Sequence, residues 1–186
     1  MGSLVNIMVM QNNPGVIELK KKIPVHKDWP KPGINFIDVN GILTDPLSYD
    51  TCIKWLKTLA FEKPPTSIVA IESRGFLFGS PIAHSLKLPL VIVRKPNKLP
   101  GELKTITYDT EYSTDSLSIQ ANAPIGDRPL IVDDLLATGG TIIAVKKLLD
   151  VESVNAAVII NLAFLPGLKN LKDNNISCDA LIVYDE

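Results

Sequence analysis

Residues Leu130–Thr141 read Leu-Ile-Val-Asp-Asp-Leu-Leu-Ala-Thr-Gly-Gly-Thr, and the fold can be inferred from this stretch. The first three residues are apolar and predict a buried strand that ends where Asp133 and Asp134 begin. Apolar residues recur at helical spacing over Ile142–Leu149, which predicts a helix directly after the glycines. Because further strands and helices alternate along the chain, we expect an α/β fold with a mostly parallel twisted sheet covered by helices on both faces.

The turn between this strand and this helix has the chemistry of an anion site. Gly139 and Gly140 let backbone N–H groups approach a ligand closely, and the first turn of a helix carries unpaired N–H groups and partial positive charge. Both features suit a phosphate, and the hydroxyls of Thr138 and Thr141 add donors. The acidic pair before the turn needs another partner, either ribose hydroxyls or a magnesium ion. The stretch therefore predicts a sugar-phosphate site, with a simple tight turn as the alternative.

A second strand-to-helix turn follows the predicted buried strand Ser67–Ile71. It contains Ser73 and Arg74, whose hydroxyl and guanidinium groups suit a diphosphate. In open α/β sheets, ligands collect at the carboxyl ends of the strands. An arginine exposed on the surface is the alternative interpretation.

A basic segment follows the next predicted strand, Leu88–Val93. Residues Arg94–Gly101 contain three cations, two prolines and a glycine. This composition is typical of a mobile loop that can close over a ligand, although a solvated surface hairpin would have the same composition.

These motifs together resemble the type I phosphoribosyltransferases, and among them the adenine phosphoribosyltransferases. The acidic pair and Ala137–Thr141 are similar to the family's binding motif for 5-phosphoribosyl 1-diphosphate (PRPP). Ala137 stands where enzymes for 6-oxopurines usually carry aspartate. Residues Ser73–Gly79 match the family's diphosphate loop at every position, with Glu72 in place of the more common aspartate before it. In the family, a cis peptide usually precedes the serine of this loop.

Two further segments carry the same resemblance, one on each side of the diphosphate motif. Pro32-Gly33 and Phe36 belong to a stretch that forms part of the base pocket in the family, and Ile37 stands where arginine is frequent. Residues 108–112 read Tyr-Asp-Thr-Glu-Tyr and match the family's flap, although Ser113 replaces the usual glycine after it.

The resemblance implies a single phosphoribosyltransferase domain over residues 1–186, with an N-terminal hood over about residues 1–40 and a flexible catalytic loop over about residues 95–120. The family's reaction transfers the 5-phosphoribosyl group of PRPP to adenine in purine salvage, which gives AMP and diphosphate. Magnesium is the implied cofactor, held mainly through the PRPP diphosphate with no direct metal ligand, and a homodimer is the implied assembly. The implied catalytic residues are Glu111, Arg74 and Tyr112; the 5-phosphate and ribose residues are Asp133, Asp134, Ala137, Thr138, Gly139, Gly140 and Thr141; the diphosphate residues are Ser73, Arg74, Arg94, Lys95 and Lys98; the adenine residues are Asn35, Phe36 and Ile37.

Composition excludes several other classes of function. The formal net charge is −1, so no overall field attracts nucleic acid or an anionic membrane. Neither the two cysteines nor the two histidines have the spacing of a metal site or a nucleophilic constellation. The N-terminal apolar run is too short for a membrane span and has no preceding basic region, which favours the cytoplasm.

Two other functions are compatible with the same motifs. A phosphoribosyltransferase for another base would keep the PRPP site and change the base pocket near Ile37. A regulator that binds PRPP without catalysis would keep the fold, and should lack the flap glutamate or carry a nucleic-acid surface. Glu111 is present and the chain has no basic excess, which ranks the regulator last.

Overall fold

The computed structural model describes residues 13–109 and 114–186. In this part of the chain, a five-stranded parallel sheet runs in the order β4-β3-β7-β8-β9. This confirms the α/β fold and the parallel sheet expected from the sequence. The strands are β3 (Ser67–Ile71), β4 (Leu90–Val93), β7 (Pro129–Leu136), β8 (Val154–Leu162) and β9 (Ile176–Tyr184).

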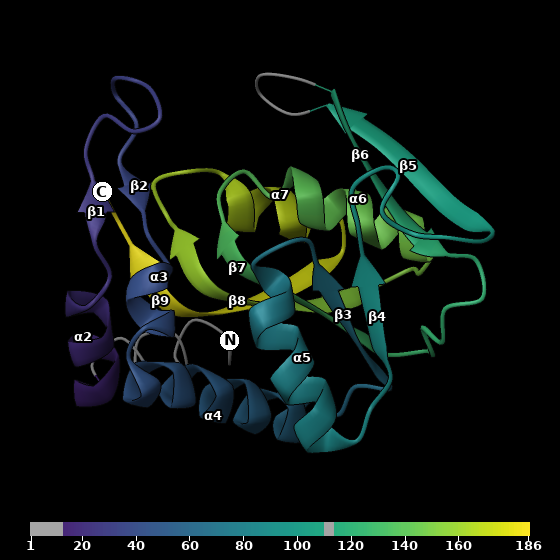
Figure 1. The fold of residues 1–186 in the computed structure, drawn as a ribbon, viewed down its shortest axis with the longest axis horizontal. Coiled ribbons are helices and arrows are strands. Elements are labelled where there is room, and N and C mark those ends of the chain that lie inside the picture. The colour runs from purple at the N-terminus through teal and green to yellow at the C-terminus, as the bar shows by residue number, and fades with distance from the viewer. Residues whose placement is uncertain (1–12, 110–113) are drawn as a thin grey trace.

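Helices cover both faces of the sheet (Figure 1). The sheet therefore separates the core into two clusters of buried residues. One cluster joins the sheet to the helices that lie before β4 in the chain, and Phe78 and Leu56 are fully buried in it. The other joins the opposite face to the two later helices, with Ile142 and Leu171 buried there. The first group is α2 (Pro14–Lys21), α3 (Asn40–Leu43), α4 (Pro46–Glu62) and α5 (Gly75–Leu86), and the second is α6 (Gly140–Leu149) and α7 (Gly167–Asp173).

Local chemistry explains where the longest of these helices begins. The Asp45 carboxylate accepts a hydrogen bond from the backbone N–H of Ser48 at 3.0 Å, and Pro46 occupies the first turn. Both features are favourable at a helix N-terminus, because the side chain satisfies an otherwise unpaired N–H and proline lacks one. These two residues therefore determine where the helix begins.

Two antiparallel hairpins project from the same side of the sheet (Figure 1). The hood hairpin consists of β1 (Val25–His26) and β2 (Phe36–Ile37) at the upper left. The flap ribbon consists of β5 (Leu103–Asp109) and β6 (Thr114–Gln120) at the upper right. Between the two hairpins lie the carboxyl ends of the central strands.

Strand β7 corrects one expectation. The acidic pair was expected after the strand, but β7 continues to Leu136, so Asp133 and Asp134 lie inside it. The register shows why: pairing with β3 ends at Val132, whereas pairing with β8 continues through Leu136. The acidic pair therefore lies where only one edge of the strand is still occupied by a neighbour.

No helix among the described residues is long and apolar enough to cross a bilayer.

Candidate active site

A cavity of about 550 Å³ lies at the carboxyl ends of β3 and β7. Its walls come from the loop after β3, the end of β7, the turn before α6 and the inner side of the flap ribbon. The cavity brings together residues that the sequence assigns to phosphate, ribose and diphosphate: Ser73, Arg74, Lys95, Asp133, Asp134 and the run 137–141.

The turn before α6 has the geometry of an anion site. Gly139 has a φ of +87°, a conformation that side chains rarely adopt, and a Cβ there would lie 3.1 Å from Leu171 Cδ2. The amide of Asn170 donates to the carbonyl of Thr138 at 3.0 Å, so α7 holds the turn from behind. No side chain in the described part of the chain caps the N-terminus of α6. Its first N–H groups can therefore serve an anionic ligand.

The acidic pair lies where its ionised form is disfavoured. Asp134 is only 5% exposed, and its backbone N–H donates to Oδ1 of Asp133 at 3.0 Å. Loss of water raises the pKa of Asp133 well above its usual range, and the neighbouring charge of Asp134 raises it further. Burial also raises the pKa of Asp134, although the charge of Arg74 acts in the opposite direction. Hydroxyl donors from a sugar would compensate both carboxylates.

Arg74 connects the acidic pair to the hood hairpin. Its Nε lies 2.6 Å from Oδ2 of Asp134, an ion pair without a well-directed hydrogen bond. Its guanidinium carbon lies 5.8 Å from the centre of the Phe36 ring. The same side chain therefore reaches both Asp134 and the aromatic residue expected in the base pocket.

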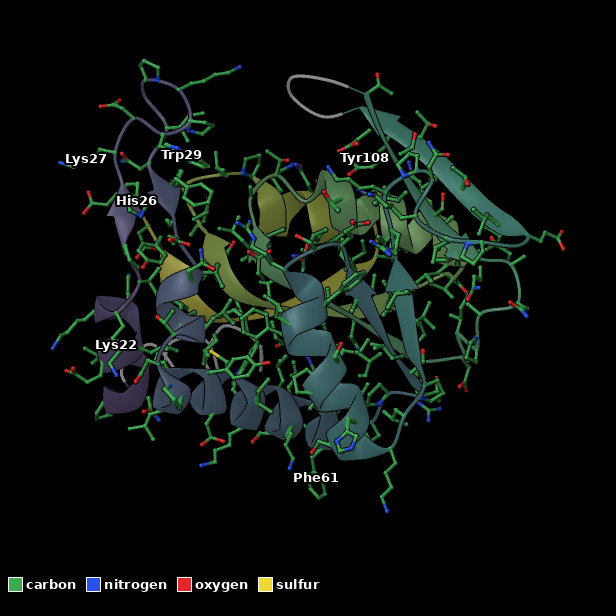
Figure 2. All side chains as sticks on the ribbon, in the orientation of Figure 1. Lys22, His26, Lys27, Trp29, Phe61 and Tyr108 are labelled. Carbon is green, nitrogen blue, oxygen red and sulfur yellow. The ribbon has the colours of Figure 1, made fainter. Side chains whose placement is uncertain are left out.

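The hood hairpin places Phe36 beside this arginine and packs Trp29 against Phe36. The rings of Phe36 and Trp29 meet edge to face at a centroid distance of 4.4 Å. Trp29 lies on the hood hairpin and Tyr108 on the flap ribbon across from it (Figure 2). Asn35 is exposed, whereas the Ile37 side chain is buried in the core. A ligand on the hood can therefore meet Ile37 only through its backbone.

The basic segment after β4 is only partly at the cavity. Lys95 lines it, whereas Arg94 and Lys98 do not. The Arg94 guanidinium instead contacts both carboxylate oxygens of Glu72 at 3.2 Å. These hydrogen bonds lower the pKa of Glu72 and keep its carboxylate ionised.

Comparison with known proteins decides the family. A family model described as the phosphoribosyl transferase domain matches residues 38–178. The adenine phosphoribosyltransferase of Yersinia enterocolitica is 45% identical over 168 residues, which cover 88% of this chain and 90% of the relative. The chain belongs to the adenine phosphoribosyltransferase family.

Solved structures of adenine phosphoribosyltransferases agree with this assignment. The enzyme from Thermoanaerobacter pseudethanolicus aligns with a TM-score of 0.81 at 41% identity, over 91% of this chain and 99% of that chain. The enzyme from Saccharomyces cerevisiae, solved with adenine and an imino-altritol bisphosphate, aligns with a TM-score of 0.82 at 36% identity, over 90% of this chain and 98% of that one. The resemblance found in the sequence motifs is thus confirmed over nearly the whole chain.

Two details of the family resemblance have different outcomes. The peptide bond between Glu72 and Ser73 is cis, as the family's diphosphate loop implies. Glu111 and Tyr112, the expected flap residues, and Ser113 after them lie outside the described residues, so their roles stay predictions.

Several cavity residues were not assigned to the site from sequence. Tyr108 lines the cavity, and its hydroxyl lies 3.3 Å from Oγ1 of Thr141, which links the flap ribbon to the first turn of α6. Asp115 and Glu72 also line it. The flap motif contains Tyr108 and could have identified it, whereas Asp115 stands in no motif and no sequence signal marks it.

Gly75 separates the diphosphate loop from the acidic pair, and we expect Gly75→Ala to damage both. A Cβ at Gly75 would lie 2.7 Å from the carbonyl oxygen of Val132 and 3.0 Å from Oδ1 of Asp133. The strand carbonyl cannot move cheaply, so overpacking should lower the free energy of unfolding by about 1–3 kcal/mol. PRPP affinity should fall as well, because the displaced carboxylate is Asp133.

Chemical denaturation and PRPP titration measure these two effects. Gly140→Ala is the matched control for stability, because a Cβ there meets no atom within 4 Å. If Gly75→Ala unfolds at the wild-type denaturant concentration, the close packing of the two loops is wrong.

Proposed function

We propose that this chain transfers the 5-phosphoribosyl group of PRPP to adenine and so produces AMP and diphosphate in purine salvage. The position of Arg74 is the observation that best supports this proposal. Arg74 lies in the loop expected to bind diphosphate, and from there it contacts Asp134, expected to bind ribose, and the Phe36 ring of the hood hairpin. One side chain thus joins the three places that PRPP and adenine must occupy together. Membership of the adenine phosphoribosyltransferase family supports the same activity.

PRPP binding divides between two ends of the cavity. The 5-phosphate would bind residues 137–141, where the helix N-terminus and the two threonine hydroxyls donate. The ribose hydroxyls would donate to Asp133 and Asp134. At the other end, Ser73 and Arg74 would bind the diphosphate, with Arg94, Lys95 and Lys98 adding positive charge.

Adenine would bind at the hood hairpin. Its ring would pack against Phe36, and backbone groups of Asn35 and Ile37 would bind its edge. The burial of the Ile37 side chain supports a backbone contact and explains why isoleucine can replace the arginine frequent at this position. The side chain at this position therefore has little influence on the choice of base.

The reaction breaks the bond from the anomeric carbon to the diphosphate oxygen and forms a bond to a purine nitrogen. Positive charge develops on the ribose in the transition state, so positioned carboxylates and a neutralised leaving group supply most of the rate. Glu111 would take the proton from the purine nitrogen, which adds about 10²–10⁴-fold. Tyr112 and the closed flap would exclude water from the reacting carbon.

Magnesium fits this site as a companion of the substrate. Among the described residues, no group of three or more histidines, cysteines or acids could hold a metal ion alone. Magnesium is commonly bound by one or two carboxylates together with substrate phosphates, and Asp133 and Asp134 lie beside the expected diphosphate position. Bound there, magnesium would offset the negative charge of the leaving diphosphate.

Chelation of magnesium is therefore expected to abolish turnover while leaving the protein folded. Excess EDTA should reduce diphosphate release to background without shifting the thermal unfolding midpoint, because residues 13–109 and 114–186 contribute no complete metal site. Added magnesium should restore the rate. A lowered unfolding midpoint in EDTA would indicate a structural metal and contradict this assignment.

We also propose a cytoplasmic homodimer. Large apolar side chains on α4 and α5, among them Leu47, Phe61 and Leu77, are exposed and suit a second copy of the chain. Phe61 points away from the body of the molecule (Figure 2). Sedimentation of wild type and Phe61→Ser tests whether this surface is the contact.

A base panel tests the proposed activity directly. Diphosphate release from PRPP and magnesium is measured with adenine, hypoxanthine, guanine or no base. Release with adenine alone is expected. Release with another base would keep the PRPP site and overturn the base pocket, and PRPP binding without release would favour the regulator.

A further inference from the structure

Glu72 is an acid at the edge of a site expected to bind a highly anionic substrate. It follows the last residue of β3, its backbone N–H donates to the carbonyl of Val93 at 2.9 Å, and it lines the cavity. A carboxylate in this place should repel a diphosphate by simple Coulomb interaction. Its presence there therefore needs a reason.

Three directed hydrogen bonds converge on the Glu72 side chain, which is only 14% exposed. Oε1 accepts from Nη2 of Arg94 and Oε2 from Nε of the same residue, both at 3.2 Å. Oε2 also accepts from the backbone N–H of Lys95 at 2.8 Å. The carboxylate thereby fixes both the Arg94 guanidinium and the start of the basic segment.

Arg94 also contacts the flap ribbon, so Glu72 is connected to the ribbon through it. Its backbone forms an antiparallel bridge with Ser118 of β6, with hydrogen bonds of 2.9 and 2.8 Å in the two directions. Its guanidinium also lies 5.9 Å from the centre of the Phe76 ring in α5. Glu72 and Arg94 therefore tie together the diphosphate loop, the basic segment and the ribbon.

We propose that Glu72 is a positioning residue that holds Arg94 and the backbone of Lys95, so that the Lys95 side chain faces the diphosphate. Arg94 then acts on the substrate through this anchoring, since Glu72 engages its Nε and Nη2 and the carbonyl of Lys98 accepts from its Nη1 at 3.4 Å. Lys95 carries the charge that meets the ligand, and it lines the cavity where Arg94 does not. The inference rests on the proposed PRPP-dependent activity.

The direction in which Glu72→Gln changes the KM for PRPP separates this role from simple repulsion. Glu72→Gln has the same shape and removes a negative charge, so repulsion alone predicts a lower KM for PRPP. Anchoring predicts the opposite: KM for PRPP rises about tenfold, while KM for adenine stays unchanged. Glu72→Asp keeps the charge and should remain nearer to wild type than the isosteric glutamine, which a merely structural role would not predict.

A double-mutant cycle with Arg94→Gln shows whether the two residues act together. If Glu72 works through Arg94, the double variant binds PRPP no more weakly than the poorer single variant. Multiplied effects would mean that Arg94 contacts the diphosphate independently, and would overturn the proposal. A KM for PRPP in Glu72→Gln at or below the wild-type value would also overturn it.

Binding of magnesium diphosphate by calorimetry separates this proposal from the proposed function. Wild type should bind it, and Glu72→Gln should bind it about tenfold more weakly, whether or not adenine is the second substrate. Asp50→Asn is the matched control, because it removes a surface ion pair with Lys54 at 2.7 Å on α4. A wild type that binds diphosphate but never converts adenine would refute the proposed function alone.

Discussion

Asp133→Asn should lower kcat/KM for PRPP by about 100-fold and, in the same variant, make the free protein more stable. The activity is lost because an ionised carboxylate accepts a charge-assisted hydrogen bond from a ribose hydroxyl, and an amide oxygen accepts a weaker one. Stability rises because burial and the neighbouring charge of Asp134 raise the pKa of Asp133, so its ionised form is disfavoured in the folded protein, whereas asparagine carries no charge. The charge of the site therefore lowers the stability of the free protein and raises the affinity for the ligand.

The pH dependence of this gain has a definite sign. A carboxyl group with a raised pKa in the folded state stabilises the fold below its unfolded pKa, and this contribution is lost as the pH rises through the folded value. Wild type should therefore lose stability relative to Asp133→Asn above about pH 4. At pH 7 the variant should melt about 2–4 °C higher, and below pH 4 the difference should disappear.

Thermal unfolding across this pH range, without ligand, measures the effect. Asp50→Asn, an exposed acid in an ion pair on α4, should show no such gain. Saturating PRPP should reverse the order, since only wild type binds it tightly. A variant that is active and no more stable would mean that Asp133 contacts no substrate.

The sequence predicts the parts of this site that depend on neighbouring residues. Gly139 and the threonines around it predict the anion turn because conformational freedom and donors lie within five residues. Phe36 is predicted only by resemblance to the family, since one aromatic in a short strand has many possible uses.

Contacts between segments that lie far apart in the chain cannot be predicted from these local patterns. Arg74 and Asp134 lie sixty positions apart in the chain and 2.6 Å apart in the fold, because β3 and β7 are neighbours in the sheet. The partnership of Glu72 and Arg94 depends in the same way on the pairing of β3 with β4. The extension of β7 past the acidic pair depends on β8, which no pattern within Leu130–Thr141 reveals.

Arg74→Ala should cause the largest loss of activity, with kcat/KM reduced by about 10²–10³-fold. The guanidinium neutralises the leaving diphosphate in the proposed reaction, and no other cation contacts both Asp134 and Phe36 among the described residues. The loss of the Arg74 side chain should also change how activity depends on pH.

Burial raises the pKa of Asp134 and the charge of Arg74 opposes that rise, so without the arginine the pKa of Asp134 increases further. Because PRPP needs the ionised carboxylate, the acid limb of the pH profile of kcat/KM should move to higher pH.

Arg74→Lys separates the two consequences. Lysine keeps the positive charge beside Asp134, so the acid limb of the pH profile of this variant should stay near that of wild type. It lacks the planar, bidentate fork that matches a diphosphate, so kcat/KM should remain well below wild type. Profiles of kcat/KM against pH for the three proteins provide the measurement. If the alanine variant keeps the wild-type acid limb and rate, Arg74 is a surface arginine, and the link it makes between the ribose carboxylates and the base pocket has no part in the reaction.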